Sequence, residues 1–314
     1  MSTPAARFRR RALTAARVAG LRTSFRILEV VAPRRAGVRA FVLWCTLPGN
    51  PGRRKDFRAG PGEVVRVEAP RGGSIVAEVW GEGPTVYLVH GWGGWRGQLG
   101  AFVAPLVDAG FRVVGFDAPG HGDSDPGVMG PGRGTLVEVV EALEVVGQEF
   151  GEAAGIVAHS MGCTAASMAV RKSLPAASLV LVAPNHDFDE ITRDFARVLG
   201  LSERTRRLLH DAIRDFTQRP ISDFDLEPQG ADGRLPDTLI LHDRLDKETP
   251  YEVSVGLAGS WPGSTLVTTE GLGHQRILAD PTTIATAVEH IRERVPAAVA
   301  VQRRARSDRA EART

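Results

Sequence analysis

Cysteine is scarce in this chain, which has only two, Cys45 and Cys163, among 314 residues. Two cysteines do not indicate a disulfide framework, and this fits a reducing cytoplasm. No apolar segment approaches the roughly 18 residues that a membrane-spanning helix requires. The apolar residues near the start are interrupted by Arg17 and Arg22, so the sequence does not indicate a signal peptide.

The chain also lacks a strong excess of charge of one sign, since 39 Lys and Arg face 37 Asp and Glu. A formal net charge of +2 gives no global argument for a nucleic-acid partner. No HExxH or CxxC cluster is present, so no metal is predicted. The glycine-rich stretch 91–94 lacks the spacing of a dinucleotide-binding loop, so no cofactor is expected.

Arginine is concentrated at the two ends of the chain. Residues 1–36 hold nine arginines and a single acid, Glu29. We interpret residues 1–62 as a basic N-terminal helical segment and linker whose arginines form a solvated helix face. The alternative is membrane contact by an amphipathic helix, but its apolar stripe is poor in large residues: Phe8, Ala12, Ala15 and Ala19. The charged residues 303–314 are expected to form a disordered tail.

Residues 63–302 alternate between short apolar runs and stretches with helical periodicity. The expected strands cover 64–67, 74–79, 85–89, 111–116, 155–157, 178–182, 238–241 and 264–268. The expected helices cover 97–109, 135–150 and 282–295. This order predicts an α/β fold with a mostly parallel central sheet and helices on both faces. Residues 185–236 hold no clear strand, and their helical spacing predicts a small helical cap inserted over the site.

One serine stands in Ala158-His159-Ser160-Met161-Gly162, between the expected strand 155–157 and a further expected helix that continues through 163–170. A strand, a tight turn and a helix form a nucleophile elbow, which holds a serine hydroxyl out of the sheet. The turn is sharp, so the positions two before and two after the serine must be small. Ala158 and Gly162 meet that requirement, and Ser160 is therefore the candidate nucleophile.

A serine hydroxyl needs a base, and His274 follows the last expected strand in a glycine-rich loop. The histidine in turn needs a carboxylate, for which Asp243 and Asp246 both stand after the strand 238–241. An oxyanion hole requires two backbone donors. The expected donors are the N–H groups of Met161, directly after the serine, and of Trp92, in the loop 90–94.

Two further residues of that loop are candidates for substrate binding. Gly91 allows the backbone to approach a substrate closely. Trp95 is a candidate for the wall of an acyl pocket, and the alternative is that it only covers the sheet.

These residues together resemble the α/β-hydrolase superfamily over about residues 63–295. Five segments carry the resemblance in the family's order: His90-Gly91-Trp92-Gly93, Asp117 to Ser124, Ala158 to Gly162, the loop 242–250 and Gly273-His274. The sequence looks most like bacterial esterases and lipases of the lysophospholipase-like kind with a short helical cap. The family's acid loop reads His-Gly-x-x-Asp-x-x-Val-Pro, and that spacing favours Asp246 over Asp243.

The resemblance implies a serine hydrolase that cleaves carboxylic esters of small molecules through an acyl-enzyme. Acyl transfer, thioester or lactone hydrolysis and cofactor-free peroxidation would use the same triad. A non-catalytic binding protein of the same fold is a further alternative.

Overall fold

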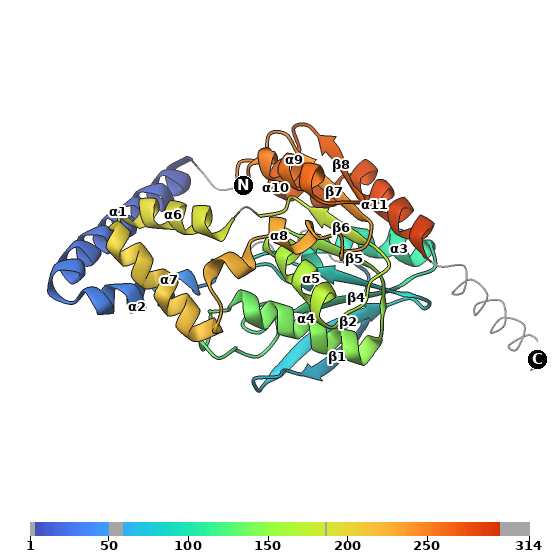
Figure 1. The fold of residues 1–314 in the computed structure, drawn as a ribbon, viewed down its shortest axis with the longest axis horizontal. Helices are drawn as coiled ribbons and strands as arrows, with labels where there is room; N and C mark the ends of the chain where they lie inside the picture. The colour runs from blue at the N-terminus through green and yellow to red at the C-terminus, as the bar shows by residue number, and fades with distance from the viewer. Residues whose placement is uncertain (1–3, 50–58, 186, 296–314) are drawn as a thin grey trace, which may run out of the picture. The chain divides into compact units, whose positions relative to one another are not determined.

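The computed structural model describes residues 4–49, 59–185 and 187–295, and the side chains from Ala16 onward within them. The expected tail at 303–314 and the side chains of Phe8, Ala12 and Ala15 lie outside the described part. The elements follow one another as α1 Pro4–Val31, α2 Pro33–Trp44, β1 Glu63–Glu68, β2 Ser74–Trp80, β3 Thr85–Val89, η2 Arg96–Phe102, α3 Val103–Asp108, β4 Arg112–Asp117, α4 Leu136–Phe150, β5 Ala153–His159, α5 Met161–Lys172, β6 Leu179–Val182, α6 Phe188–Leu199, α7 Glu203–Thr217, η3 Ile221–Phe224, α8 Glu227–Gly230, β7 Thr238–Asp243, α9 Tyr251–Ser260, β8 Ser264–Thr269, α10 Gly273–Arg276, η4 Ile277–Ala279 and α11 Pro281–Arg294 (Figure 1).

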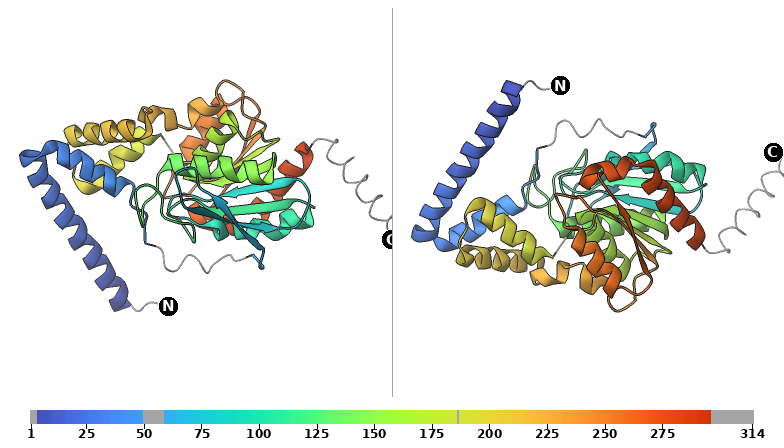
Figure 2. Two further views of the ribbon diagram at one scale, coloured as in Figure 1. Left: turned by 90° about the horizontal axis from the view of Figure 1, so that it is seen from below. Right: turned by 90° about the horizontal axis from the view of Figure 1, so that it is seen from above.

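The centre of the fold is an eight-stranded sheet in the order β1-β2-β4-β3-β5-β6-β7-β8. β1 and β2 pair antiparallel, β2 pairs antiparallel with β4, and the other neighbours run parallel. The helices α3 and α11 cover one face, and α4 and α5 cover the other (Figure 2). The predicted α/β fold with a mostly parallel sheet is therefore confirmed. Its carboxyl edge carries the loops that follow β3, β5, β7 and β8.

The inner strands are buried on both faces, as a continuous apolar sequence predicts for a parallel sheet. All five residues of β3 are buried, and so are all four of β6. One core cluster includes Val86 and Leu88 of β3, Leu106 of α3, and Ile291 of α11. This core fixes the positions of the strand ends.

The expected helix at 97–109 is wrong in its first half. The structure has the 3-10 helix η2 over 96–102, and an α-helix begins only at Val103. Leu99 has a φ of −98° and a ψ of 19°, which interrupts regular helical geometry. Gly97 leaves room for the indole of Trp95, whose ring would lie 2.3 Å from an added Cβ.

The chain divides into two compact units. The helical unit comprises Met1–Thr46 with Asp187–Asp225, and the sheet unit comprises the remainder of the chain. Within the helical unit the ring of Trp44 meets that of Phe195 at 5.4 Å, and Phe41 meets Phe216 at 5.4 Å. The N-terminal helices thus pack with most of the expected insertion, while α8 belongs to the sheet unit.

Within the part of the chain that the structure describes, no helix combines the length and the apolar character needed to cross a bilayer.

Candidate active site

Ser160 occupies the turn between β5 and α5 with a backbone conformation that is rare for a residue with a side chain. Its φ is 53° and its ψ is −125°. Such a conformation costs roughly 1–3 kcal/mol and persists only where the surroundings enforce it. The Ser160 N–H donates to the carbonyl of Val182 at 3.0 Å, and the N–H of Cys163 donates to the carbonyl of Ser160 at 2.9 Å.

The residues around the turn must be small because other backbone passes close by. A Cβ added at Gly162 would lie 2.6 Å from the carbonyl oxygen of His90. A Cβ added at Gly91 would lie 3.1 Å from the Cβ of Ser160, so this loop lies directly against the candidate nucleophile. Ala158 is completely buried.

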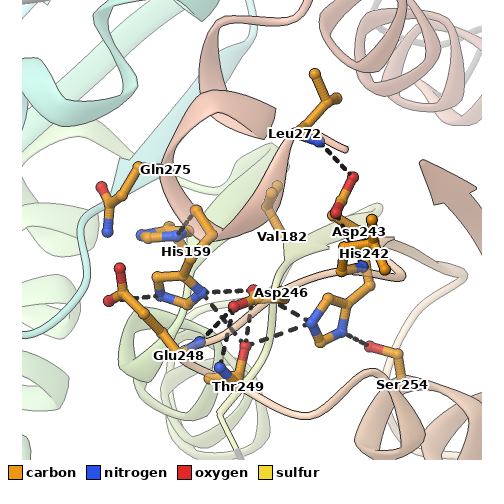
Figure 3. Close-up of polar contacts among 12 residues, drawn as sticks. His159, Val182, His242, Asp243, Asp246, Glu248, Thr249, Ser254, Leu272 and Gln275 are labelled. Atoms are coloured by element: carbon orange, nitrogen blue, oxygen red, sulfur yellow. Dashed lines mark hydrogen bonds and ion pairs between the residues drawn. The ribbon is translucent and has the colours of Figure 1, made fainter. Parts of the chain in front are cut away.

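The structure brings the candidate base and one candidate acid together. The Nδ1 of His274 and the Oδ2 of Asp246 are 2.7 Å apart, and both side chains are buried. The hydroxyl of Thr249 donates to the same Asp246 oxygen at 3.1 Å (Figure 3). The Asp246 carboxylate accepts a hydrogen bond from Nδ1–H of His274. The Nε2 of a neutral His274 therefore remains available to accept a proton. His274 lies in the short helix α10, where a glycine-rich loop had been expected.

A second histidine, His242 at the end of β7, also contacts the carboxylate of Asp246. Its Nε2 lies 3.4 Å from Oδ2 of Asp246, and its Nδ1 lies 2.6 Å from the hydroxyl of Ser254. Burial would raise the pKa of Asp246, but hydrogen bonds from His242, His274 and the Glu248 N–H outweigh it and lower that pKa. Asp246 is therefore held as a carboxylate.

The other candidate acid, Asp243, holds a different part of the site. Its Oδ2 accepts from the N–H of Leu272 at 2.8 Å and from the hydroxyl of Thr269 at 2.9 Å. Its Oδ1 accepts from the N–H of Leu245 at 3.0 Å. Burial alone would raise the pKa of Asp243, but these hydrogen bonds outweigh burial, so the pKa of Asp243 is lowered. Asp243 thus ties the end of β7 to the loop before His274.

His159, the residue before Ser160, connects the elbow to the candidate base. Its Nε2–H donates to the backbone carbonyl of His274 at 3.0 Å, and the two rings lie 4.6 Å apart. The elbow and α10 are therefore joined although they lie 115 residues apart in the chain. The sequence predicts neither the bond of His159 to His274 nor the contact of His242 with Asp246.

The loop 90–94 is held by side chains on both sides. His90 donates from Nδ1 to the Gly91 carbonyl at 2.8 Å and accepts from the N–H of Ala118 at 3.1 Å. These two bonds fix the neutral tautomer, and burial lowers the pKa of His90. A trans peptide places its N–H opposite its carbonyl, so fixing the Gly91 carbonyl also fixes the direction of the Trp92 N–H.

Gln98 supports the same loop from η2. Its Oε1 accepts from the N–H of Gly91 at 3.1 Å, and its Nε2 donates to the Oε1 of Gln275 at 3.3 Å. Gln275 directly follows the candidate base. No local pattern predicts the bond between Gln98 and Gln275, because these two residues lie 177 positions apart in the chain.

The two tryptophans of this region differ in exposure. Trp92 is half-buried and its ring meets that of His121 at 5.7 Å. Trp95 is buried, with its indole over Gly97, and the guanidinium of Arg96 lies 5.9 Å from the ring. The expected contact of Trp95 with a substrate stays a prediction.

A cavity of about 360 Å³ opens beside the candidate base. It is lined by Leu245, Lys247, Glu248, Gly271, Gly273, His274 and Arg276. The Oε2 of Glu248 lies 3.9 Å from the Nε2 of His274, so a carboxylate stands beside the nitrogen that would take up a proton. Among the described residues, no group of three or more His, Cys, Asp or Glu side chains could hold a metal ion.

The model of the alpha/beta hydrolase family matches residues 86–287. The chain belongs to this family. The match includes the loop 90–94, the elbow, the acid loop and His274. A catalytic triad and an oxyanion loop are features typical of the family.

Curated relatives match over parts of their length. The dihydrolipoyllysine-residue acetyltransferase component of an acetoin cleaving system from Cupriavidus necator is 31% identical over 179 residues, which is 56% of this chain and 44% of that protein. A 2-hydroxy-6-oxo-6-phenylhexa-2,4-dienoate hydrolase from Comamonas testosteroni is 36% identical over 113 residues, 33% of this chain and 37% of that protein. The chain thus spans less than half the length of these two relatives.

Solved structures of the same fold include an esterase from Exiguobacterium antarcticum, with a TM-score of 0.57, 20% identity, and coverage of 73% of this chain and 99% of that one. An esterase from Thermogutta terrifontis has a TM-score of 0.58, 22% identity, and coverage of 74% and 100%. At these identities the likeness shows the fold.

Proposed function

We propose that the chain is a serine hydrolase that cleaves carboxylic esters through an acyl-enzyme on Ser160. The observation that carries the proposal is the distance of 2.7 Å between Nδ1 of His274 and Oδ2 of Asp246. His159 connects this candidate base to the turn that bears Ser160, because it donates to the backbone carbonyl of His274. The strained φ of 53° at Ser160 supports it, because such strain is concentrated at functional positions. Several family relatives carry names of hydrolases and esterases.

In the proposed reaction, Nε2 of His274 takes the proton of the Ser160 hydroxyl as Oγ attacks the ester carbonyl. The carbonyl oxygen becomes an oxyanion, to which the N–H groups of Trp92 and Met161 donate. The tetrahedral adduct collapses, the ester C–O bond breaks, and the alcohol leaves with the proton from His274. Water then attacks the acyl-enzyme, again with His274 as base, and releases the acid and the serine.

Asp246 keeps the imidazole oriented and stabilises it when it is protonated. The lowered pKa of Asp246 leaves the carboxylate charged throughout the cycle. Thr249 and His242 hold this carboxylate in place by their contacts to Oδ2.

Hydrolysis of p-nitrophenyl esters of increasing chain length tests the proposal. The wild-type chain should release p-nitrophenol and Ser160→Ala should not, while both keep the same melting temperature. Ser167→Ala is the matched control, since Ser167 is a buried serine on α5 away from the turn. Equal turnover by wild type and Ser160→Ala would contradict the proposal.

Acyl transfer is a second candidate, because one relative is named an acetyltransferase component. The same acyl-enzyme would then be attacked by an alcohol, amine or thiol in place of water. Adding such acceptors during ester turnover separates the two reactions: a transferase forms the acceptor's acyl product at the expense of free acid, and a hydrolase does not.

A further inference from the structure

A group of exposed apolar side chains lies at the junction of α1 and α2, within the helical unit. Among the described residues nine large hydrophobic side chains are exposed, and four of them fall between Ile27 and Val38. They are Ile27 at 60% exposure, Val30 at 83%, Val31 at 69% and Val38 at 60%. Exposure of this extent in a cluster is unusual and marks an interaction surface.

The helix geometry explains why these side chains point outward. Ile27, Val30 and Val31 are three and four residues apart, so they share one face of α1. On α2 the buried positions are Ala36, Gly37 and Ala40. A Cβ added at Gly37 would lie 2.5 Å from the Cβ of Leu208, so this face is closed against α7. Val38 therefore lies on the face of α2 that α7 does not cover.

Basic residues flank the apolar ones along the chain. Arg26, Arg34 and Arg35 are exposed, and no described carboxylate pairs with them. Two neighbouring arginines are already occupied: Arg22 donates to the carbonyl of Val198 at 2.9 Å, and Arg39 lies 5.5 Å from the ring of Phe25. Three unpaired positive charges thus remain beside the apolar group.

Negative charge is nearly absent from this stretch. Glu29 is the single acid between residues 17 and 46, and its carboxylate accepts from the N–H and the hydroxyl of Ser202, both at 2.8 Å. That contact turns the charge toward α7. Burial alone would raise the pKa of Glu29, but hydrogen bonds from Thr205 and Ser202 outweigh burial and lower it. We call Arg26, Ile27, Val30, Val31, Arg34, Arg35 and Val38 the junction patch; α1 and α2 meet there at a sharp corner (Figure 2).

We propose that the junction patch binds the surface of an anionic lipid bilayer. Apolar side chains that enter the interface and arginines that meet anionic headgroups are the combination that surface-lying helices use. The partner is lipid because the patch joins unpaired positive charge with aliphatic side chains that can enter a fluid phase. No described helix can span a bilayer, so the contact would lie in the interfacial plane.

Vesicle flotation of the full chain tests this proposal. The probes are vesicles of phosphatidylcholine alone and of phosphatidylcholine with phosphatidylserine. The chain should float with the anionic vesicles at low salt and much less with the neutral ones, and added salt should release it. Equal binding to neutral and anionic vesicles, or no binding to either, would overturn the proposal.

Two triple variants of equal charge locate the surface. Arg26→Gln/Arg34→Gln/Arg35→Gln should lose about a hundredfold in partition coefficient, because each basic residue near an anionic surface contributes about fivefold. The matched control is Arg204→Gln/Arg207→Gln/Arg219→Gln, which removes three exposed arginines of the same helical unit outside the patch. Equal losses in the two variants would show a general charge effect and refute the patch.

Ile27→Ser/Val30→Ser tests the apolar part and should weaken binding at least tenfold at constant charge. Residues 1–16 are unchanged in every variant. Any vesicle binding by that segment is therefore the same in all of them and does not affect the comparison. Circular dichroism must show wild-type helix content and melting. A dimer in vesicle-free buffer that Ile27→Ser/Val30→Ser dissociates would instead identify a second copy of the chain as the occupant, and would overturn the proposal.

Discussion

Several side chains of the candidate site contact the carboxylate of Asp246. His274, His242 and Thr249 all reach its Oδ2, while Asp243 binds the loop leading to α10. Spacing along the acid loop favoured Asp246, but the separate task of Asp243 could not be predicted. Two of its donors, Thr269 and Leu272, lie 26 and 29 residues further along the chain, and no local pattern connects them to Asp243.

Asparagine substitutions should separate the two aspartates. Asp246→Asn should reduce kcat for ester hydrolysis by about 10⁴-fold, because the amide no longer orients and stabilises the imidazole in its reactive form. Asp243→Asn removes support from the loop instead, so it should lower the free energy of unfolding by about 1–3 kcal/mol. Steady-state kinetics and urea unfolding measure both effects, and a larger kcat loss in Asp243→Asn would reverse the assignment.

His121 makes folding stability depend on pH. Burial, and then the neighbouring His90, lower the pKa of His121 to about 3. An unfolded histidine has a pKa of about 6.5. Between these two values the unfolded chain binds a proton that the folded chain does not, so stability present above pH ~6.5 is lost as pH falls, by up to about 1.4 kcal/mol per pH unit.

His121→Asn should flatten this dependence relative to wild type, in urea unfolding measured from pH 7 to pH 4. His210→Asn is the comparison, because His210 is only half-buried and its lowered pKa reflects weaker desolvation. An unchanged slope in His121→Asn would contradict the account.

Among the elements, the strands were predictable and some helices were not. Alternating or continuous apolar runs mark each strand. The helix expected over 135–150 is also present, and Thr135 caps it by accepting from the N–H of Glu138. The sequence predicts an α-helix where the structure has the 3-10 helix η2, because the apolar residues of this segment are spaced as in an α-helix. Trp95 packs over Gly97, and the spacing does not reveal this contact.

The turn between β5 and α5 depends on Gly162. Gly162→Ala places a Cβ against the carbonyls of Val89 and His90, so it should destabilise the fold by more than about 1 kcal/mol and lower kcat. Gly256→Ala is the control, since nothing lies within 4 Å of its added Cβ and alanine favours a helix by about 1 kcal/mol. Thermal melting should show opposite signs, and destabilisation by both would argue against a steric cause.

At the scale of the whole molecule, the sequence did not reveal which segments pack together. The basic N-terminal helices and the insertion were predicted as separate parts, yet Phe41 and Phe216 meet across 175 residues of sequence within one helical unit. Periodicity shows that each helix has an apolar face. It does not show which other helix covers that face.

The helical unit should open independently of the sheet unit. Trp44→Ala removes contacts to Phe188 and Phe195, so amide hydrogen exchange should accelerate in α1, α2, α6 and α7 while β3 to β7 keep their protection. Val38→Ala, an exposed neighbour on α2, should leave exchange unchanged. Acceleration that spreads equally through the sheet would show that the two units unfold as one.

The central claim is that Ser160 is a nucleophile activated by His274. A fluorophosphonate probe followed by intact-mass and peptide analysis tests it most directly. The wild-type chain should gain one covalent adduct on the peptide containing Ser160, His274→Ala should react far more slowly, and Ser160→Ala should remain unlabelled. A folded wild-type chain that stays unlabelled, or an adduct on another residue, would contradict the claim.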